Sequence, residues 1–235
     1  MKFAVIAAGE GSRLAAEGIS LPKPLVKVNG EPLIDRLIRI FMENDADEIV
    51  VICNDHTPLV KEHLTTPPLL HSSTPPLKIV VKSTPSSMHS LFEISHLLTG
   101  GPFILTTVDT VFREEEFKSY VEAFRHCDSD GLMGVTSYID DESPLYVETT
   151  PDMSITAFLD TPPHLSLTTY ISAGIYGLHG NALLTLDNCI KRQESRMRNF
   201  QRALLADGLQ LQAYPFSKVF DIDHASDITK AEQFL

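Results

Sequence analysis

A short glycine run followed by two cationic side chains is the part of this sequence best suited to chemistry. It reads Ala7-Ala8-Gly9-Glu10-Gly11-Ser12-Arg13-Leu14, and Pro22-Lys23-Pro24 follows. Glycine lets a backbone pass close to a bulky anion in conformations that a Cβ atom would forbid. Backbone N–H groups near Gly9 and Gly11 suit phosphate oxygens, Arg13 suits a bidentate clamp, and Lys23 suits a compact point charge. The pattern predicts a site for a phosphorylated ligand.

Two other kinds of phosphate loop fit this stretch less well. A dinucleotide-binding fingerprint needs a third glycine at position 14, which Leu14 occupies. A Walker loop needs a Gly-Lys pair followed by Ser or Thr, and the chain contains no Gly-Lys pair. The pattern that remains combines a glycine loop, an arginine and a later lysine.

A carboxylate is expected to complete this site with a divalent cation. Two cationic side chains do not neutralise several phosphate groups, and Mg²⁺ typically binds one or two carboxylates together with phosphate oxygens. Asp109 directly follows the apolar stretch Phe103–Val108. It therefore lies at the carboxyl end of a predicted strand, where open α/β sheets bind ligands. A capping or turn role is the alternative for Asp109.

The elements that must position these residues alternate between strand and helix. Buried apolar runs predict strands over 2–7, 48–53, 78–82 and 103–108, and helical spacing predicts helices over 32–43, 59–64, 89–98 and 115–126. The proline-rich stretch 65–77 is predicted to be a loop. This alternation requires a parallel sheet with right-handed crossovers.

The second half of the chain is richer in strands. Strands are predicted over 132–138, 145–149, 155–159, 170–178, 211–216 and 219–222, and helices over 181–191, 198–206 and 227–234. These strands fit a mixed extension of the sheet that forms the far wall of a cleft. We therefore predict an α/β fold, with a mostly parallel mixed sheet flanked by helices, in a single domain over 1–235.

Composition excludes several classes of protein. The chain has 235 residues, of which 43% are hydrophobic and 21% charged, and its net charge of −12 argues against binding to nucleic acid. No apolar stretch approaches the ~20 residues of a membrane span. The apolar run Phe3–Ala8 is too short for a secretory signal and leads straight to Glu10. Three scattered cysteines without CxxC spacing predict a reducing, cytoplasmic location.

The glycine loop combined with Pro22-Lys23-Pro24 resembles the signature of sugar-phosphate nucleotidyltransferases, also called nucleoside-diphosphate-sugar pyrophosphorylases. The resemblance implies a Rossmann-like fold of the GT-A type and Mg²⁺ as cofactor. It also implies that residues 1–130 form a nucleotide-binding half, and that residues 131–235 form a half that binds the acceptor and completes the metal site. It assigns catalysis to Arg13 and Lys23, and nucleotide contacts to Ala8, Gly9, Gly11, Ser12, Arg13 and Ser87.

The same resemblance places the metal ligands. Thr106-Thr107-Val108-Asp109 is similar to the family's metal-binding aspartate segment, and Phe220-Asp221-Ile222-Asp223 is similar to its late acidic segment. Matching by residue puts a ligand at Asp221. Asp223 is a further candidate, because alternate residues of an extended segment point to the same side. The alternative for Asp223 is a hydrogen bond to the turn before the last helix.

The segments that resemble the family's acceptor site depart from its pattern. Where relatives have Glu-Lys-Pro after a phenylalanine, this chain has Asp160-Thr161-Pro162, so Asp160 is the predicted acceptor contact and the lysine is missing. Ser172-Ala173-Gly174 resembles Asn-Ala-Gly, and Gly174 is predicted to allow close approach of a sugar. A glycine in a crowded strand is the alternative for Gly174.

These observations predict an enzyme that transfers a nucleoside monophosphate from a nucleoside triphosphate to a sugar 1-phosphate, or a similar phosphomonoester, and releases pyrophosphate. A phosphocholine-type cytidylyltransferase is one alternative, since Asp160, Tyr170 and Tyr176 would suit a cationic headgroup. A catalytically silent nucleotide-binding regulator is another. A glycosyltransferase fits less well, because Asp109-Thr110-Val111 lacks the Asp-x-Asp that such an enzyme would prefer.

Overall fold

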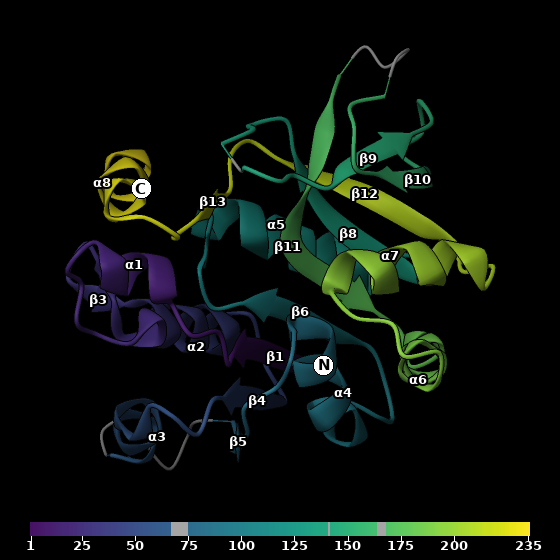
Figure 1. The fold of residues 1–235 in the computed structure, drawn as a ribbon. Coiled ribbons are helices and arrows are strands. Elements are labelled where there is room, and N and C mark those ends of the chain that lie inside the picture. Colours follow the sequence, from purple (N-terminus) through teal and green to yellow (C-terminus); the bar gives the residue numbers. More distant parts are fainter. Residues whose placement is uncertain (67–74, 141, 164–167) are drawn as a thin grey trace.

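A mixed β-sheet runs through the molecule and positions the predicted site (Figure 1). The computed structural model describes residues 1–66, 75–140, 142–163 and 168–235. Within them the sheet has nine strands, and the order along its main path is β10-β9-β11-β6-β1-β4-β5. β8 lies beside β11, and β12 lies beside β8. Most of the loop predicted over 65–77 lies outside the described residues.

The elements of the first half agree with the predicted alternation to within a few residues. The strands are β1 (Lys2–Ala7), β4 (Glu48–Cys53), β5 (Leu77–Val81) and β6 (Phe103–Thr107). The helices are α2 (Leu33–Glu43), α3 (Pro58–Thr65), α4 (Ser87–Ile94) and α5 (Glu114–Arg125). β1 pairs in parallel with both β4 and β6, and β4 pairs in parallel with β5. The carboxyl ends of these strands therefore meet at one edge.

The second half adds the antiparallel part of the sheet. Its strands are β8 (Gly131–Thr136), β9 (Tyr146–Thr149), β10 (Ile155–Leu159), β11 (Tyr170–Leu178) and β12 (Leu211–Phe216). Its helices are α6 (Ala182–Lys191), α7 (Met197–Ala206) and α8 (Ala225–Phe234). β11 pairs antiparallel with β6, β8 and β9, whereas β12 is parallel to β8. β11 therefore joins the two halves of the predicted single domain into one sheet.

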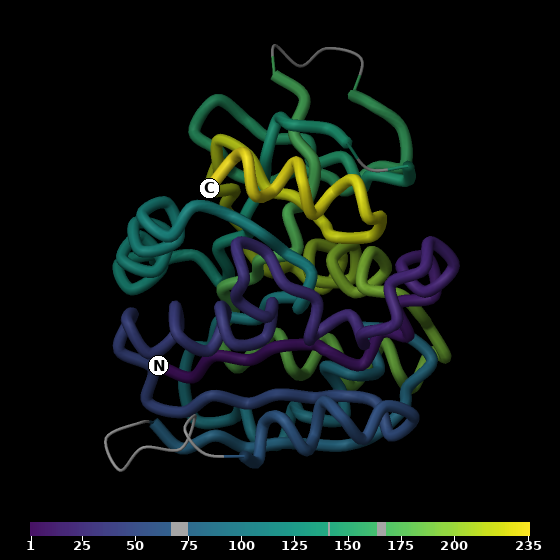
Figure 2. Tube along the Cα trace, turned by 90° about the vertical axis from the view of Figure 1, so that its left-hand side faces the viewer, coloured from purple at the N-terminus to yellow at the C-terminus, as the bar shows by residue number. Residues whose placement is uncertain are grey.

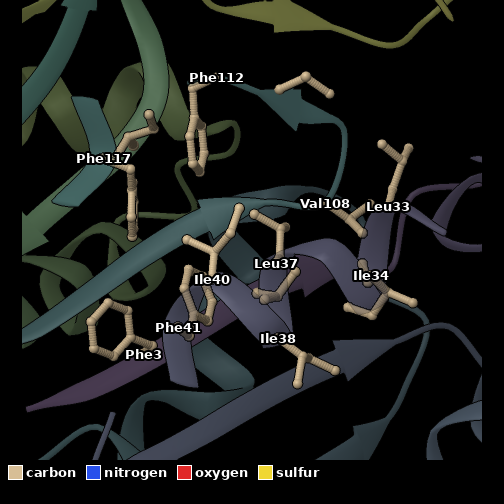
Figure 3. Packing of buried hydrophobic residues seen from close by; sticks show 14 of the residues in the cluster. Phe3, Leu33, Ile34, Leu37, Ile38, Ile40, Phe41, Val108, Phe112 and Phe117 are labelled. Carbon is tan, nitrogen blue, oxygen red and sulfur yellow. The ribbon is translucent and has the colours of Figure 1, made fainter. Parts of the chain in front are cut away.

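Alternate residues of the central strands face two separate hydrophobic clusters. On one face, Phe3, Val5 and Ala7 of β1 pack with α2, α3 and α5. Figure 3 shows the aromatic part of this cluster, in which the ring centroids of Phe3 and Phe41 lie 4.8 Å apart. On the other face, Ala4 and Ile6 pack with α4, α6 and α7. Burial of each large apolar side chain contributes about 1.5–3 kcal/mol, so both helical layers stabilise β1.

Several short elements were not predicted from the sequence. They are α1 (Ser12–Ala16), a 3₁₀ turn (Lys23–Leu25), the hairpin of β2 (Lys27–Val28) and β3 (Glu31–Pro32), and β7 (Thr110–Val111). β7 pairs antiparallel with β13 (Phe220–Asp221), which lies within the strand predicted over 219–222. A second 3₁₀ turn follows α4 over Ser95–Leu97. Figure 1 places the C-terminal α8 beside α1, and the Glu17 carboxylate accepts a hydrogen bond of 2.7 Å from the Ala225 N–H. Figure 2 shows the same arrangement from the side. The late acidic segment is thereby brought to the glycine loop.

None of the helices in the described residues combines the length and the apolar character that crossing a membrane requires.

Candidate active site

The glycine loop leaves the carboxyl end of β1 and turns into α1, which carries Arg13. Gly11 has a φ of +63°, and a Cβ atom at this position would lie 3.1 Å from Cβ of Lys23. Both the left-handed conformation and the contact with Lys23 therefore require glycine here. The loop and the lysine, which lie apart in the sequence, pack directly on each other.

One cavity collects the residues that were predicted to bind nucleotide. It has a volume of about 650 Å³, and its lining includes Ala8, Gly9, Gly11, Ser12, Arg13 and Ser87. Lys23, Asp109 and Asp223 line the same cavity. Ser87 is the first residue of α4, which begins two residues earlier than its predicted start at His89. The structure thus places the whole predicted nucleotide set around one space, which we call the loop cavity.

Lys23 joins two of the predicted metal ligands. Its Nζ donates to Asp109 Oδ2 at 2.5 Å and to Asp223 Oδ1 at 2.7 Å. Lys23 is only 8% exposed. Nη1 of Arg13 donates to the other carboxylate oxygen of Asp223 at 2.6 Å. The two predicted catalytic cations and two of the predicted metal ligands therefore form one connected cluster.

The charges in this cluster stabilise one another. Burial opposes the charge on Lys23, but attraction to Asp109 and hydrogen bonds to Asp109 and Asp223 raise its pKa above the usual value. Burial likewise opposes the charge on Asp109. Attraction to Lys23 and hydrogen bonds from Lys23 and Thr107 nevertheless lower the pKa of Asp109. Both groups are therefore charged at neutral pH.

Among the described residues the Asp223 carboxylate bonds Lys23 and Arg13 and not the turn before the last helix, which was its alternative role. In that turn Asp227 forms a capping box with His224, and its Oδ2 accepts hydrogen bonds from the backbone N–H of Asp223 at 3.2 Å and of His224 at 2.8 Å. The side chain of Asp223 turns towards Lys23 and Arg13. This orientation agrees with the prediction that it acts in the site.

A second cavity of about 320 Å³ is lined by Asp109, Asp221 and Asp223. We call it the arginine cavity, because Arg196 and Arg198 also line it. Oxygens of Asp109 and Asp223 converge on the single Nζ atom of Lys23. Hard carboxylate oxygens that meet at one cation are the donors that Mg²⁺ prefers, so the donor chemistry fits this metal. The described residues contain no cluster of three or more His, Cys, Asp or Glu already arranged around one metal position. A metal here would have to share the carboxylates with Lys23.

The predicted acceptor residues fall in different places. Gly174 lines the arginine cavity and has a φ of +71°. A Cβ atom there would lie 3.0 Å from Thr110 Oγ1 and 3.2 Å from Thr107 Oγ1, so Gly174 sits in a crowded strand and also borders a cavity. Asp160, in contrast, is not among the residues that line this cavity. Its carboxylate lies 2.8 Å from the guanidinium groups of both Arg198 and Arg202.

Residues at the start of α7 are the part of the site that sequence reasoning missed. Arg196, Arg198 and Gln201 line the arginine cavity together with Ser172 and Tyr176. Arg196 has a φ of 73° and a ψ of 141°, a strained backbone conformation for a residue other than glycine. The only sequence signal was a pair of arginines at the beginning of a predicted helix, which is too common a pattern to indicate a site.

Comparison with known proteins agrees with this geometry. The sequence model of a family described as nucleotidyl transferase matches residues 2–235. The glucose-1-phosphate cytidylyltransferase of Salmonella typhimurium is 29% identical over 63 residues, which span 27% of this chain and only 24% of that protein.

Solved structures share the fold at lower identity. The inositol-1-phosphate CTP transferase from T. maritima has a TM-score of 0.77 and 16% identity, with 99% of this chain and 96% of that chain covered. The UDP-glucose pyrophosphorylase from Acinetobacter baumannii has a TM-score of 0.82 and 16% identity, with 99% and 92% covered. The loop, the lysine and the carboxylates thus lie on the expected fold, and the family match spans both halves of the sheet. The chain belongs to the nucleotidyl transferase family.

Proposed function

We propose that this protein transfers a nucleoside monophosphate from a nucleoside triphosphate to a sugar 1-phosphate or a similar phosphomonoester. The observation that carries this proposal is the meeting of two cavities. The loop cavity and the arginine cavity share Ser87, Thr107, Asp109 and Asp223. Such an arrangement suits two phosphorylated substrates that react where their sites join.

The reaction needs alignment more than a strong base. An oxygen of the acceptor phosphate attacks the α-phosphorus of the triphosphate, a new P–O bond forms, and the bond to the pyrophosphate oxygen breaks. Because the nucleophile is already an anion, catalysis depends on bringing two anions together and on stabilising the leaving group. Lys23 lines the loop cavity and bonds Asp109 and Asp223, which border both cavities, so it suits the first task. Arg13 in the loop cavity suits the second.

A divalent cation is part of the proposal. Asp109, Asp221 and Asp223 are the residues that would hold Mg²⁺. When bound, the metal would neutralise phosphate charge that Lys23 and Arg13 leave uncompensated. This proposal is supported by the hard oxygen donors that converge on Lys23.

The lining of the arginine cavity supports an anionic, hydroxyl-rich acceptor. Arg196 and Arg198 supply positive charge near Asp109, which compensates for the lysine that is missing at Thr161. Ser172, Gln201 and Tyr176 supply groups that can hydrogen-bond hydroxyls. Asp160 neither lines this cavity nor remains available, since Arg198 and Arg202 engage it. A choline headgroup in this cavity would therefore lack the Asp160 contact and would lie near Arg196 and Arg198.

We also infer that the protein works in the cytoplasm on a nucleoside triphosphate and a phosphorylated small molecule, without nucleic acid or membrane as partner. The supporting observations are the net charge of −12 and three cysteines that form no disulfide with one another in the structure.

A pyrophosphate-release assay tests the function. The protein is incubated with Mg²⁺, each common nucleoside triphosphate, and a panel of sugar 1-phosphates, inositol phosphate and phosphocholine. We expect release with one pair from the sugar or polyol phosphates, and its loss in both Lys23→Ala and Asp109→Ala. Lys27→Ala is the matched control, because Lys27 is an exposed lysine of β2 that lines neither cavity.

Release that needs phosphocholine would favour the cytidylyltransferase alternative. Nucleotide binding without any pyrophosphate across the panel would favour the silent regulator, and near-normal turnover in both variants would refute the proposed mechanism.

A further inference from the structure

Asn54 is a buried polar residue beside the glycine loop that the proposed reaction does not use directly. It follows the last residue of β4 and is 4% exposed. β4 is in parallel register with β1, and Cys53 pairs with Ala7. Asn54 therefore lies beside the point where the chain leaves β1 and enters the loop.

Both ends of the Asn54 carboxamide are engaged. Its Nδ2 donates to the backbone carbonyls of Ala8 at 3.5 Å and Gly9 at 3.3 Å. Its Oδ1 accepts hydrogen bonds from the N–H of Thr57 at 3.0 Å and from its hydroxyl at 2.6 Å. Thr57 precedes α3, so the start of that helix fixes the orientation of the amide. The donor end is thereby presented to the loop.

The orientation of these two carbonyls determines where the loop's N–H groups point. In a trans peptide the carbonyl and the following N–H point in opposite directions, and the described chain has no cis peptide. Carbonyls of Ala8 and Gly9 that face Asn54 therefore direct the N–H groups of Gly9 and Glu10 away from it. Gly9 and Glu10 both line the loop cavity, and the backbone N–H of neither donates a hydrogen bond within the described residues.

We propose that Asn54 is a positioning residue that holds the glycine loop with the Gly9 and Glu10 amides directed at the phosphates of the nucleotide. This inference rests on the proposed function, because it assumes that the loop cavity binds a triphosphate. Asn54 acts through the loop backbone and touches no substrate itself.

Asn54→Asp separates the two ends of the amide. A carboxylate retains both acceptor bonds from Thr57, but it cannot donate to the Ala8 and Gly9 carbonyls and repels their oxygens. We expect the variant to bind inorganic tripolyphosphate with Mg²⁺ about tenfold more weakly or worse, as measured by calorimetry. In turnover assays the KM for the nucleotide should rise, while the KM for the acceptor stays within about twofold.

Asn44→Asp is the matched control. Asn44 is also buried, at 8% exposure, and its Nδ2 donates to the backbone carbonyl of Ile40 at 2.8 Å. Unlike Asn54, it lies at the end of α2 and away from the glycine loop, and it lines neither cavity. It should destabilise the protein without weakening tripolyphosphate binding. Equal affinity in Asn54→Asp and wild type, or an equal loss in Asn44→Asp, would overturn the inference.

A measurement on the wild-type protein avoids any dependence on variant folding. On addition of tripolyphosphate with Mg²⁺, the amide resonances of Gly9 and Glu10 should shift more than those of the other residues in the loop cavity. Binding without movement of these two resonances contradicts the role of Asn54. A wild-type protein that binds no tripolyphosphate instead refutes the proposed function, and the inference falls with it.

Discussion

Lys23 illustrates how single residues of this site combine roles. It is almost completely buried, it contacts the glycine that forms the loop, and it bridges carboxylates from two distant segments. A lysine at this depth needs its carboxylate partners, because an unpaired buried charge is strongly destabilising. The carboxylates need Lys23 for the same reason, so the site is held together by the charges that would bind the substrates.

Arg196 is expected to bind the acceptor's phosphate. It lines the arginine cavity, whereas its neighbours Arg198 and Arg202 already share the Asp160 carboxylate. A charge-assisted bond to phosphate contributes about 1.5–3 kcal/mol, so Arg196→Ala should raise the KM for the acceptor about tenfold or more. The KM for the nucleotide should stay nearly unchanged in steady-state assays.

Arg192→Ala is the control for this prediction. Arg192 is an exposed arginine in the same connection between α6 and α7, and it lines neither cavity. Its Nε donates to Glu194 Oε1 at 2.7 Å. An unchanged acceptor KM in Arg196→Ala would show that the acceptor binds elsewhere.

Of the residues of β11, Gly174 has the backbone conformation that least tolerates a side chain. Its φ of +71° disfavours any side chain, and a Cβ atom would press on the Thr107 and Thr110 hydroxyls. Gly174→Ala should lower the free energy of unfolding by about 1–3 kcal/mol, as measured by denaturant titration. Gly180→Ala should have little effect, since a Cβ there meets nothing within 4 Å and no positive φ applies. Equal stability of the two variants would refute the argument from strain.

At the scale of elements, Arg39 links three segments through ion pairs. Its guanidinium on α2 lies 2.8 Å from Glu31 on β3 and 2.9 Å from Glu114 at the start of α5. The hydrogen bond from Arg39 lowers the pKa of Glu114. A group with a lowered folded-state pKa contributes stability above its unfolded pKa, here about 4.3, and loses that contribution as the pH falls through the folded pKa.

The stability difference between wild type and Arg39→Gln should therefore be largest near neutral pH and should shrink below about pH 4. Thermal unfolding of both proteins across this range is the measurement. Lys191→Gln, which removes an exposed pair with Asp187, should cause little change at any pH. A difference between wild type and Arg39→Gln that stays constant with pH would contradict the assignment to Glu114.

Long helices and strands bounded by turn-forming residues were predictable from the sequence, and most of the short elements were not. The apolar runs of β1 and β4 are buried on both faces between two helical layers, so the pattern alone marks them. α1 has five residues and β7 has two, and such elements depend on tertiary contacts instead of local periodicity. Their absence from the prediction follows from their length.

The same distinction applies to the site. Gly9, Gly11, Arg13, Lys23 and Asp109 could be predicted because a strand end and a local motif place them. Arg196 could not, because the connection between α6 and α7 brings it beside Ser86 and into the cavity. Asn54 could not, because the pairing of β4 with β1 brings it to the loop. The ion pairs of Asp160 with Arg198 and Arg202 could not be predicted either, because matching residue types does not reveal which tertiary partners a carboxylate has.

At the scale of the whole molecule, a strongly acidic chain places four cationic side chains around the cavities where the proposed substrates would meet. The net charge is −12, yet Arg13, Lys23, Arg196 and Arg198 all border the two cavities. The first half of the sheet supplies the loop and Asp109, and the second supplies Asp221, Asp223 and the arginines. Neither half alone contains all of these residues, and the family match covers residues 2–235.

The fate of the triphosphate's phosphorus atoms tests the central claim most directly. The protein is given the nucleoside triphosphate and acceptor identified by the pyrophosphate assay, labelled in turn at the α- and γ-phosphorus, and the products are separated by chromatography. Attack at the α-phosphorus predicts that the α-label enters a nucleoside diphosphate ester of the acceptor and that the γ-label leaves as pyrophosphate. Recovery of the γ-label in the acceptor or as inorganic phosphate would contradict nucleotidyl transfer.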